Sequence, residues 1–113
     1  MRQGRIKTIH QRLVQGDFSC EELTDAFLRR MRKEQQLNAY ITQTEELARF
    51  QARFVDQKRK ENRPFGPLEG VPMTLKDNIS TKGILTTCAS KMLEHYVPVY
   101  DATIVKKLRE AGA

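Results

Sequence analysis

The chain has 113 residues, about the length of one domain, and its 20 Lys and Arg against 14 Asp and Glu give a formal net charge of +6 at pH 7. With 39% hydrophobic and 30% charged residues, the composition is that of a soluble globular protein and excludes a low-complexity or disordered chain. No apolar stretch approaches the roughly 20 residues that cross a membrane. Two cysteines, Cys20 and Cys88, are too few for a disulfide framework, so we expect a reduced, cytoplasmic compartment.

The positive charge suggests two functions that the pattern of residues does not favour. All charged residues before Asp17 are basic, as in an organelle transit peptide. However, no serine occurs before Ser19, and the apolar residues of this segment have helical spacing. A nucleic-acid module would gather its basic residues. Here the basic residues are spread along the polar faces of the predicted helices among Glu and Asp, and only Lys58, Arg59 and Lys60 form a run of three, with no aromatic residues between them as stacking platforms.

Helical spacing of apolar residues predicts a first helix over residues 6–15, closed by Gly16 in the left-handed conformation. Ser19 and Glu22 have the spacing of a capping box, which predicts a second helix running to about Glu34. Six apolar residues are expected to face inward from these helices: Ile6, Ile9, Leu13, Leu23, Phe27 and Met31.

After a short extended link over residues 38–41, Thr42 and Glu45 repeat the capping-box spacing and predict a third helix that extends to about Glu61. Its aromatic residues are interpreted as core rather than as a binding surface. The expected buried stripe consists of Leu47, Phe50, Phe54 and Val55.

Glycine and proline become frequent after Asn62, and helical periodicity disappears. Apolar residues at positions 71, 73 and 75 alternate with polar ones, which predicts a strand with one buried face that has Pro72 at its start or on an edge. A turn at residues 81–83 and a short helix over residues 91–95, capped by Ser90, are expected next.

A last helix is expected after Asp101 as its cap, with Gly112 closing it and Ile104, Val105 and Leu108 facing inward. The predicted fold class is α/β: three N-terminal helices, then a strand, a loop and a helix, with an incomplete sheet. We divide the chain into a helical region, residues 1–61, and the start of an α/β core, residues 62–113.

Lys76 is the titratable residue with the most unusual setting, because it ends the apolar strand and is followed by Asp77 and Asn78 in a loop. Strand ends of α/β sheets commonly carry catalytic groups. Alternation places Lys76 and Asn78 on one face and turns Asp77 away. From spacing alone, a strand-end lysine that is simply exposed to solvent is the favoured interpretation.

The other reactive residues carry weaker signals. His10 and His95 lie far apart without metal-ligand spacing, so surface or capping roles are expected for both. Cys88 lies among small residues with no base nearby in the sequence, and structural burial is its expected role. No phosphate-binding glycine loop or paired-carboxylate signature occurs.

Four segments together resemble a known family. Residues 37–41 read LNAYI, residues 66–78 read GPLEGVPMTLKDN, residues 86–90 read TTCAS and residues 96–103 read YVPVYDAT. These segments resemble the opening of amidase-signature enzymes, most closely the A subunits of glutamyl-tRNA(Gln) amidotransferases. The resemblance covers nearly the whole chain.

The resemblance implies an amidase-signature fold and an enzyme that hydrolyses glutamine, releasing ammonia to convert Glu-tRNA(Gln) into Gln-tRNA(Gln). Family members use a Ser-cis-Ser-Lys triad, and the position that matches its lysine is Lys76. Neither serine has a match here, since no glycine- and serine-rich loop occurs and Ser80 and Ser90 do not correspond to one. We therefore expect an N-terminal fragment that is inactive alone, because a lysine accepts a proton only where burial favours its neutral form.

The resemblance also implies partners: amidotransferase B and C subunits, glutamine as substrate, and tRNA contacted through the complex. It implies no cofactor or metal in this chain, with ATP and Mg²⁺ used by the partner subunit. Two alternatives remain open. In the first, the chain is part of a general amidase that acts on another amide. In the second, it is a non-catalytic module whose basic helices dock on a partner protein or RNA.

Overall fold

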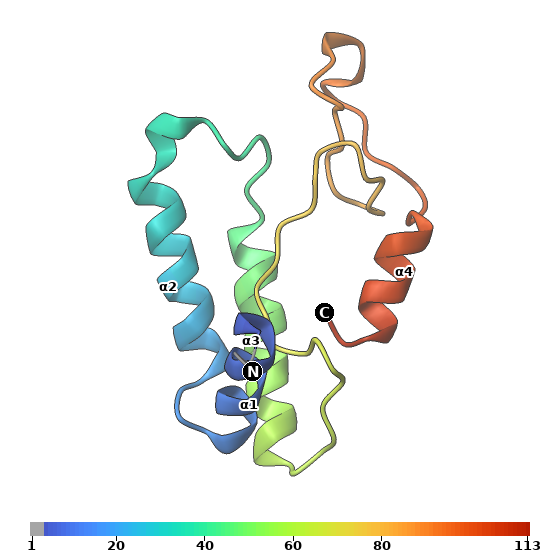
Figure 1. Cartoon of the computed structure of the whole chain (residues 1–113). Helices are drawn as coiled ribbons and strands as arrows, with labels where there is room; N and C mark the ends of the chain where they lie inside the picture. The colour runs from blue at the N-terminus through green and yellow to red at the C-terminus, as the bar shows by residue number, and fades with distance from the viewer. Residues whose placement is uncertain (1–3) are drawn as a thin grey trace.

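The structure is a computed structural model that describes residues 4–113, so the first three residues of the predicted helical region lie outside the described part. Its helices are α1 (Arg5–Gln15), α2 (Cys20–Lys33), α3 (Glu45–Lys60) and α4 (Thr103–Glu110), with short 3-10 turns η1 (Gln35–Leu37) and η2 (Lys91–Leu93). Helices α2 and α3 form an antiparallel hairpin with α1 across its base, and a long loop leads from α3 to α4 (Figure 1).

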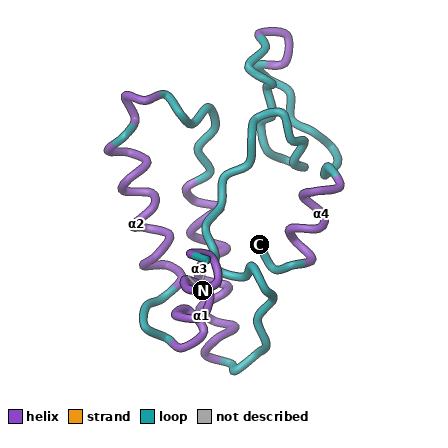
Figure 2. The backbone as a smooth tube through the Cα atoms, in the orientation of Figure 1, coloured by secondary structure: helices purple, strands orange, loops and turns teal. Residues whose placement is uncertain are grey.

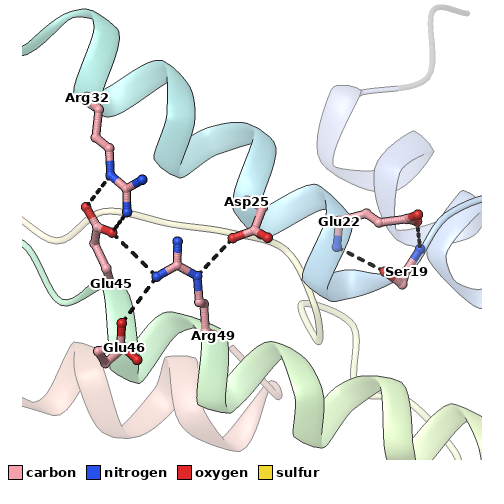
Figure 3. Close-up of polar contacts among 7 residues, drawn as sticks. All are labelled: Ser19, Glu22, Asp25, Arg32, Glu45, Glu46 and Arg49. Carbon is pink, nitrogen blue, oxygen red and sulfur yellow. Dashed lines mark hydrogen bonds and ion pairs between the residues drawn. The ribbon is translucent and has the colours of Figure 1, made fainter.

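The predicted capping box at the start of α2 is confirmed. The Ser19 hydroxyl accepts from the Glu22 amide at 3.0 Å, and the Glu22 carboxylate accepts from the Ser19 amide at 2.8 Å (Figure 3). Asp56 of α3 adds a second cap, since its carboxylate accepts from the amides of Cys20 at 2.7 Å and Glu21 at 3.0 Å. Helix α3 thereby binds the positive end of the α2 dipole.

Ion pairs join the far half of the same hairpin (Figure 3). Arg49 of α3 donates to Asp25 of α2 at 3.0 Å, and Glu45 pairs with Arg32. The expected capping box of Thr42 and Glu45 is wrong, because α3 begins at Glu45 itself, without a side-chain cap. The Glu45 carboxylate instead forms ion pairs with Arg32 and Arg49, and the hydrogen bond from the Arg32 guanidinium lowers the pKa of Glu45.

The core lies where α1, α2 and α3 meet, and four buried residues form it: Leu13, Cys20, Ala52 and Val55. Gly70 lies against this cluster with a φ of +79°, and a Cβ there would lie 3.1 Å from Leu13 Cδ1 and 3.3 Å from Val55 Cγ1. Both the left-handed backbone and the close approach therefore require glycine at this position.

The predicted buried stripe of α3 is largely wrong. Leu47, Phe50 and Phe54 are 40%, 66% and 56% exposed, whereas Ala52 and Val55 are buried. The hairpin therefore packs on the face of α3 that carries Ala52 and Val55, and the aromatic face lies outside. Phe27 of α2, also expected inside, is 49% exposed.

The predicted strand is not present among the described residues. Residues 71–76 have no regular secondary structure, and the tube contains no strand segment (Figure 2). A strand needs a ladder of hydrogen bonds to a neighbour, and the amide of Val71 bonds only locally, to the carbonyl of Leu68 at 3.2 Å. The α/β and sheet parts of the prediction are therefore unsupported, while the helices on either side of this segment are present.

The last helix ends as expected but begins differently. Gly112 is left-handed at a φ of +91° after the last turn, and Val105 is buried, whereas Ile104 is 52% exposed. Asp101 does not cap α4, because its carboxylate accepts from the Lys82 amide at 2.7 Å and pairs with Arg109. The predicted short helix over residues 91–95 is the shorter turn η2, whose cap Ser90 is confirmed.

The molecule is less compact than a typical domain of its length. Its radius of gyration is 15.2 Å, against about 13 Å for a compact domain of this size. No helix within residues 4–113 has the length and apolar character to cross a membrane.

Candidate functional site

Lys76 ends the irregular segment that leads away from the helical core. Its carbonyl accepts from the amide of Ile79 at 3.0 Å, which closes a turn directly after the lysine. Lys76 and Asn78 are exposed and Asp77 is half-buried. The Lys76 side chain therefore points outward from a turn whose backbone is held.

Asp77 holds this turn against a segment ten residues further along the chain. Its Oδ1 accepts from the Thr87 amide at 2.9 Å, and its Oδ2 accepts from the Thr87 hydroxyl and from the Ala89 amide at 3.2 Å. The Asp77 carbonyl also accepts from the Cys88 amide at 3.1 Å. We call these four hydrogen bonds the Asp77 clamp.

The clamp depends on an unusual backbone. Cys88 and Ala89 have φ values of 51° and 53°, in the left-handed region that non-glycine residues seldom adopt. This conformation lets the amides of residues 87–89 converge on the aspartate, in the manner of a backbone anion nest. The Thr87 hydroxyl first, and then the Thr87 and Ala89 amides, lower the pKa of Asp77, so the site favours its charged form.

Further bonds hold the rest of the loop, and each joins positions far apart in the sequence. Backbone amides of Ala102, Gly83 and Thr86 donate to the carbonyls of Ser80, Pro98 and Tyr96 at 2.8, 3.0 and 3.0 Å. With the bond from the Lys82 amide to Asp101, they tie residues 76–102 into one cross-linked loop. Lys76 thus lies on a loop that is held without a sheet.

A buried ion pair anchors the segment before Lys76 to α3. Lys58 Nζ lies 2.7 and 2.8 Å from the two carboxylate oxygens of Glu69, and their side chains are 18% and 6% exposed. Glu69 also accepts from the Gly66 amide at 2.7 Å. On the same turn, the Leu68 amide donates to the Ala111 carbonyl at 3.0 Å, which joins the end of α4.

The side chains of the two histidines and Cys88, also considered from the sequence, take part in no arrangement among the described residues that resembles a reactive site. His10 Nε2 lies 2.8 Å from the Gly66 carbonyl and donates to it, and His95 is exposed beside Glu94. Cys88 is exposed, so its predicted burial is wrong, because its backbone and not its thiol faces Asp77. No cluster of His, Cys, Asp and Glu in residues 4–113 is arranged to bind a metal ion.

Sequence reasoning missed the partner of Asp77. Thr87 is 6% exposed, and no local spacing rule connects it to a residue ten positions earlier.

A hollow of about 450 Å³ lies between the start of α3 and residues 83–85, and Lys76 is not among its lining residues.

The chain matches the Amidase family model over residues 22–113. The glutamyl-tRNA(Gln) amidotransferase A chain from Natranaerobius thermophilus is 47% identical over 109 residues, covering 96% of this chain and 22% of that protein. The protein of the same name from Synechococcus sp. (strain JA-2-3B'a(2-13)) is 45% identical over 108 residues, covering 95% and 21%. This chain therefore spans about a fifth of the length of these relatives.

Two solved structures have a similar fold. One is a vestigial protein complex that bears on the evolutionary origins of an s-triazine catabolic enzyme, with a TM-score of 0.89 and 27% identity, covering 97% of this chain and 24% of its own. The other is the peptide amidase PAM in complex with the competitive inhibitor chymostatin, with a TM-score of 0.87 and 33% identity, covering 96% and 23%. With the family match over most of its residues, the chain belongs to the Amidase family.

Proposed function

We propose that this chain supplies the lysine of a Ser-cis-Ser-Lys amidohydrolase, and that the residue is Lys76. The observation that supports the proposal is the likeness to the amidotransferase A subunits, at 47% identity over 109 residues, together with the Lys76 motif inside the matched region. In this mechanism a neutral Lys76 accepts a proton through the bridging serine, and the second serine attacks the amide carbonyl.

The proposed substrate is glutamine, and the released ammonia converts Glu-tRNA(Gln) into Gln-tRNA(Gln). The names of the relatives support a role within an enzyme of several subunits. We propose amidotransferase B and C subunits as partners, with ATP and Mg²⁺ used by the partner subunit, tRNA reached through the complex, and the cytoplasm as the compartment.

The 113-residue chain is proposed to be inactive alone. Lys76 is exposed, whereas a proton-accepting lysine requires an enclosed site that disfavours its charge. No glycine- and serine-rich segment that resembles the family's nucleophile loop occurs in the sequence. Both serines of the triad and the enclosure must therefore come from residues other than these.

The test uses a hybrid enzyme, in which this chain replaces the matching region of the Natranaerobius thermophilus relative. The hybrid is assayed for ammonia release from glutamine, alongside its Lys76→Ala variant and a control, Lys91→Ala, that removes another exposed lysine. We expect activity in the hybrid and in Lys91→Ala and none in Lys76→Ala. An active Lys76→Ala variant would remove this residue from the mechanism.

The likeness to a peptide amidase at 33% identity supports a second candidate, a general amidase that acts on other amides. A second hybrid, in which this chain replaces the matching region of the peptide amidase PAM, distinguishes the two candidates. Activity that is retained only in the amidotransferase hybrid supports the amidotransferase function, and activity that is retained only in the peptide amidase hybrid supports the general amidase.

A further inference from the structure

The carboxylate of Asp77, the residue after Lys76, accepts its hydrogen bonds from Thr87 and Ala89, as part of the Asp77 clamp, and not from the lysine side chain. We propose that Asp77 is a positioning residue, which fixes the backbone of Lys76 through Thr87 and so aims the lysine at the reacting centre. The inference rests on the proposed function of Lys76.

Two backbone bonds fix the chain directly after the Lys76 Cα. The Lys76 carbonyl accepts from the Ile79 amide at 3.0 Å, and the Asp77 carbonyl accepts from the Cys88 amide at 3.1 Å. The peptide units before and after Asp77 are therefore both held, and the first of them begins at Lys76. The position and direction of the Cα–Cβ bond of the lysine set the region that its amine can reach.

The clamp requires a carboxylate specifically. Three donors converge on Asp77, and an ionised carboxylate is a pure acceptor with room for all of them. The Thr87 hydroxyl donates to Asp77 Oδ2 and itself accepts from the Ala89 amide at 3.2 Å, so it links the carboxylate to the left-handed segment. In either orientation of its side-chain amide, an asparagine would place its NH₂ group against a backbone amide, that of Thr87 or that of Ala89, and the two donors would oppose each other.

Asp101 provides a matched control for a merely structural role. Its carboxylate also bridges the loop, accepting from the Lys82 amide at 2.7 Å and pairing with Arg109 at 3.0 Å. Unlike Asp77, it is remote in sequence from Lys76 and makes no bond to the turn that carries it. Loss of either carboxylate loosens the loop, but only loss of Asp77 releases the lysine.

The test compares four variants of the hybrid enzyme: Asp77→Asn, Thr87→Val, Thr87→Ser and Asp101→Asn. Misplacing a reacting group by about 1 Å costs on the order of 100-fold in rate, so we expect Asp77→Asn and Thr87→Val to lower kcat by about that factor with KM little changed. Thr87→Ser keeps the hydroxyl and should restore most of the rate lost in Thr87→Val. Asp101→Asn should keep its kcat.

Hydrogen exchange in a peptide covering residues 86–90 gives a readout besides activity. We expect faster exchange in Asp77→Asn than in Asp101→Asn, while the helices keep their protection. A normal kcat in Asp77→Asn, or an equal loss in Asp101→Asn, overturns the positioning role, provided that Lys76→Ala is inactive. An active Lys76→Ala variant instead overturns the proposed function, so the two failures are distinguishable.

Discussion

The buried ion pair between Lys58 and Glu69 gives the sharpest stability prediction. Replacing Lys58 with methionine keeps the aliphatic chain but leaves the Glu69 carboxylate, whose side chain is only 6% exposed, without its counter-ion. Breaking a buried pair by removing one partner costs about 3 to 5 kcal/mol. Because the Lys58 side chain retains 18% exposure and water reaches the pair from its side, the low end applies, about 3 kcal/mol.

That loss is large for a chain of this length. Single domains have unfolding free energies of roughly 0.05 to 0.15 kcal/mol per residue, so about 3 kcal/mol is a substantial fraction of the total. In urea unfolding followed by far-UV circular dichroism, a slope of about 2 kcal/mol/M converts it into a midpoint lower by about 1.5 M. Lys60→Met, on an exposed neighbour in the same helix, is the control and should leave the midpoint near its original value.

The double variant Lys58→Met with Glu69→Leu tests the reason for the loss. Removing both charges should recover much of the stability, because no unpaired charge then remains buried. Part of the loss should persist, since the Gly66 amide also donates to Glu69 at 2.7 Å. An unchanged midpoint in Lys58→Met would refute the reasoning, because the pair would then be solvated rather than buried.

Three further predictions follow from the polar contacts. Asp56→Asn weakens the cap on two α2 amides and should lower the unfolding free energy by about 1 to 2 kcal/mol; an unchanged unfolding free energy would contradict the tertiary cap. Burial, and then the Asp56 charge, raise the pKa of Cys20 to about 11, so iodoacetamide at about pH 8 should label exposed Cys88 and reach Cys20 only in urea, as mass spectrometry will show. The pKa of the Asp77 carboxylate is lower in the folded chain than its ordinary value. The charged carboxylate therefore stabilises the fold at pH values above the ordinary pKa, and this stabilisation is lost as the pH falls through the folded-state pKa. Asp77→Asn should therefore destabilise the chain at neutral pH, and the difference in thermal midpoint from the unsubstituted chain should shrink in acid.

Local signals in the sequence were reliable where the structure uses local bonds. The capping box of Ser19 and Glu22 acts over three residues and was predicted correctly, as was the left-handed Gly16 that ends α1. The same spacing at Thr42 and Glu45 failed, because Arg32, a distant residue on α2, competes for that carboxylate. Spacing alone carries no information about such competitors.

Features that depend on distant residues were not predictable. Apolar periodicity shows that α3 has apolar faces but does not reveal which one meets α2, and the aromatic side proved to be exposed. The alternation around Lys76 has the form of a strand, but no neighbouring strand pairs with it in the described chain. Lys76 was singled out from its setting in the sequence, and its proposed role comes from the resemblance, whereas Thr87, which holds the neighbouring Asp77, was found only from the structure.

The role of Lys76 as a proton acceptor is tested most directly by Lys76→Arg in the hybrid enzyme, with ammonia release from glutamine as the readout. Arginine keeps the positive charge and the length of the side chain but does not lose its proton at accessible pH. The proposed mechanism predicts that Lys76→Arg folds, as judged by its thermal midpoint, and releases no ammonia above background. Turnover close to that of the unsubstituted hybrid would contradict it, because a permanent cation would then suffice where a base is required.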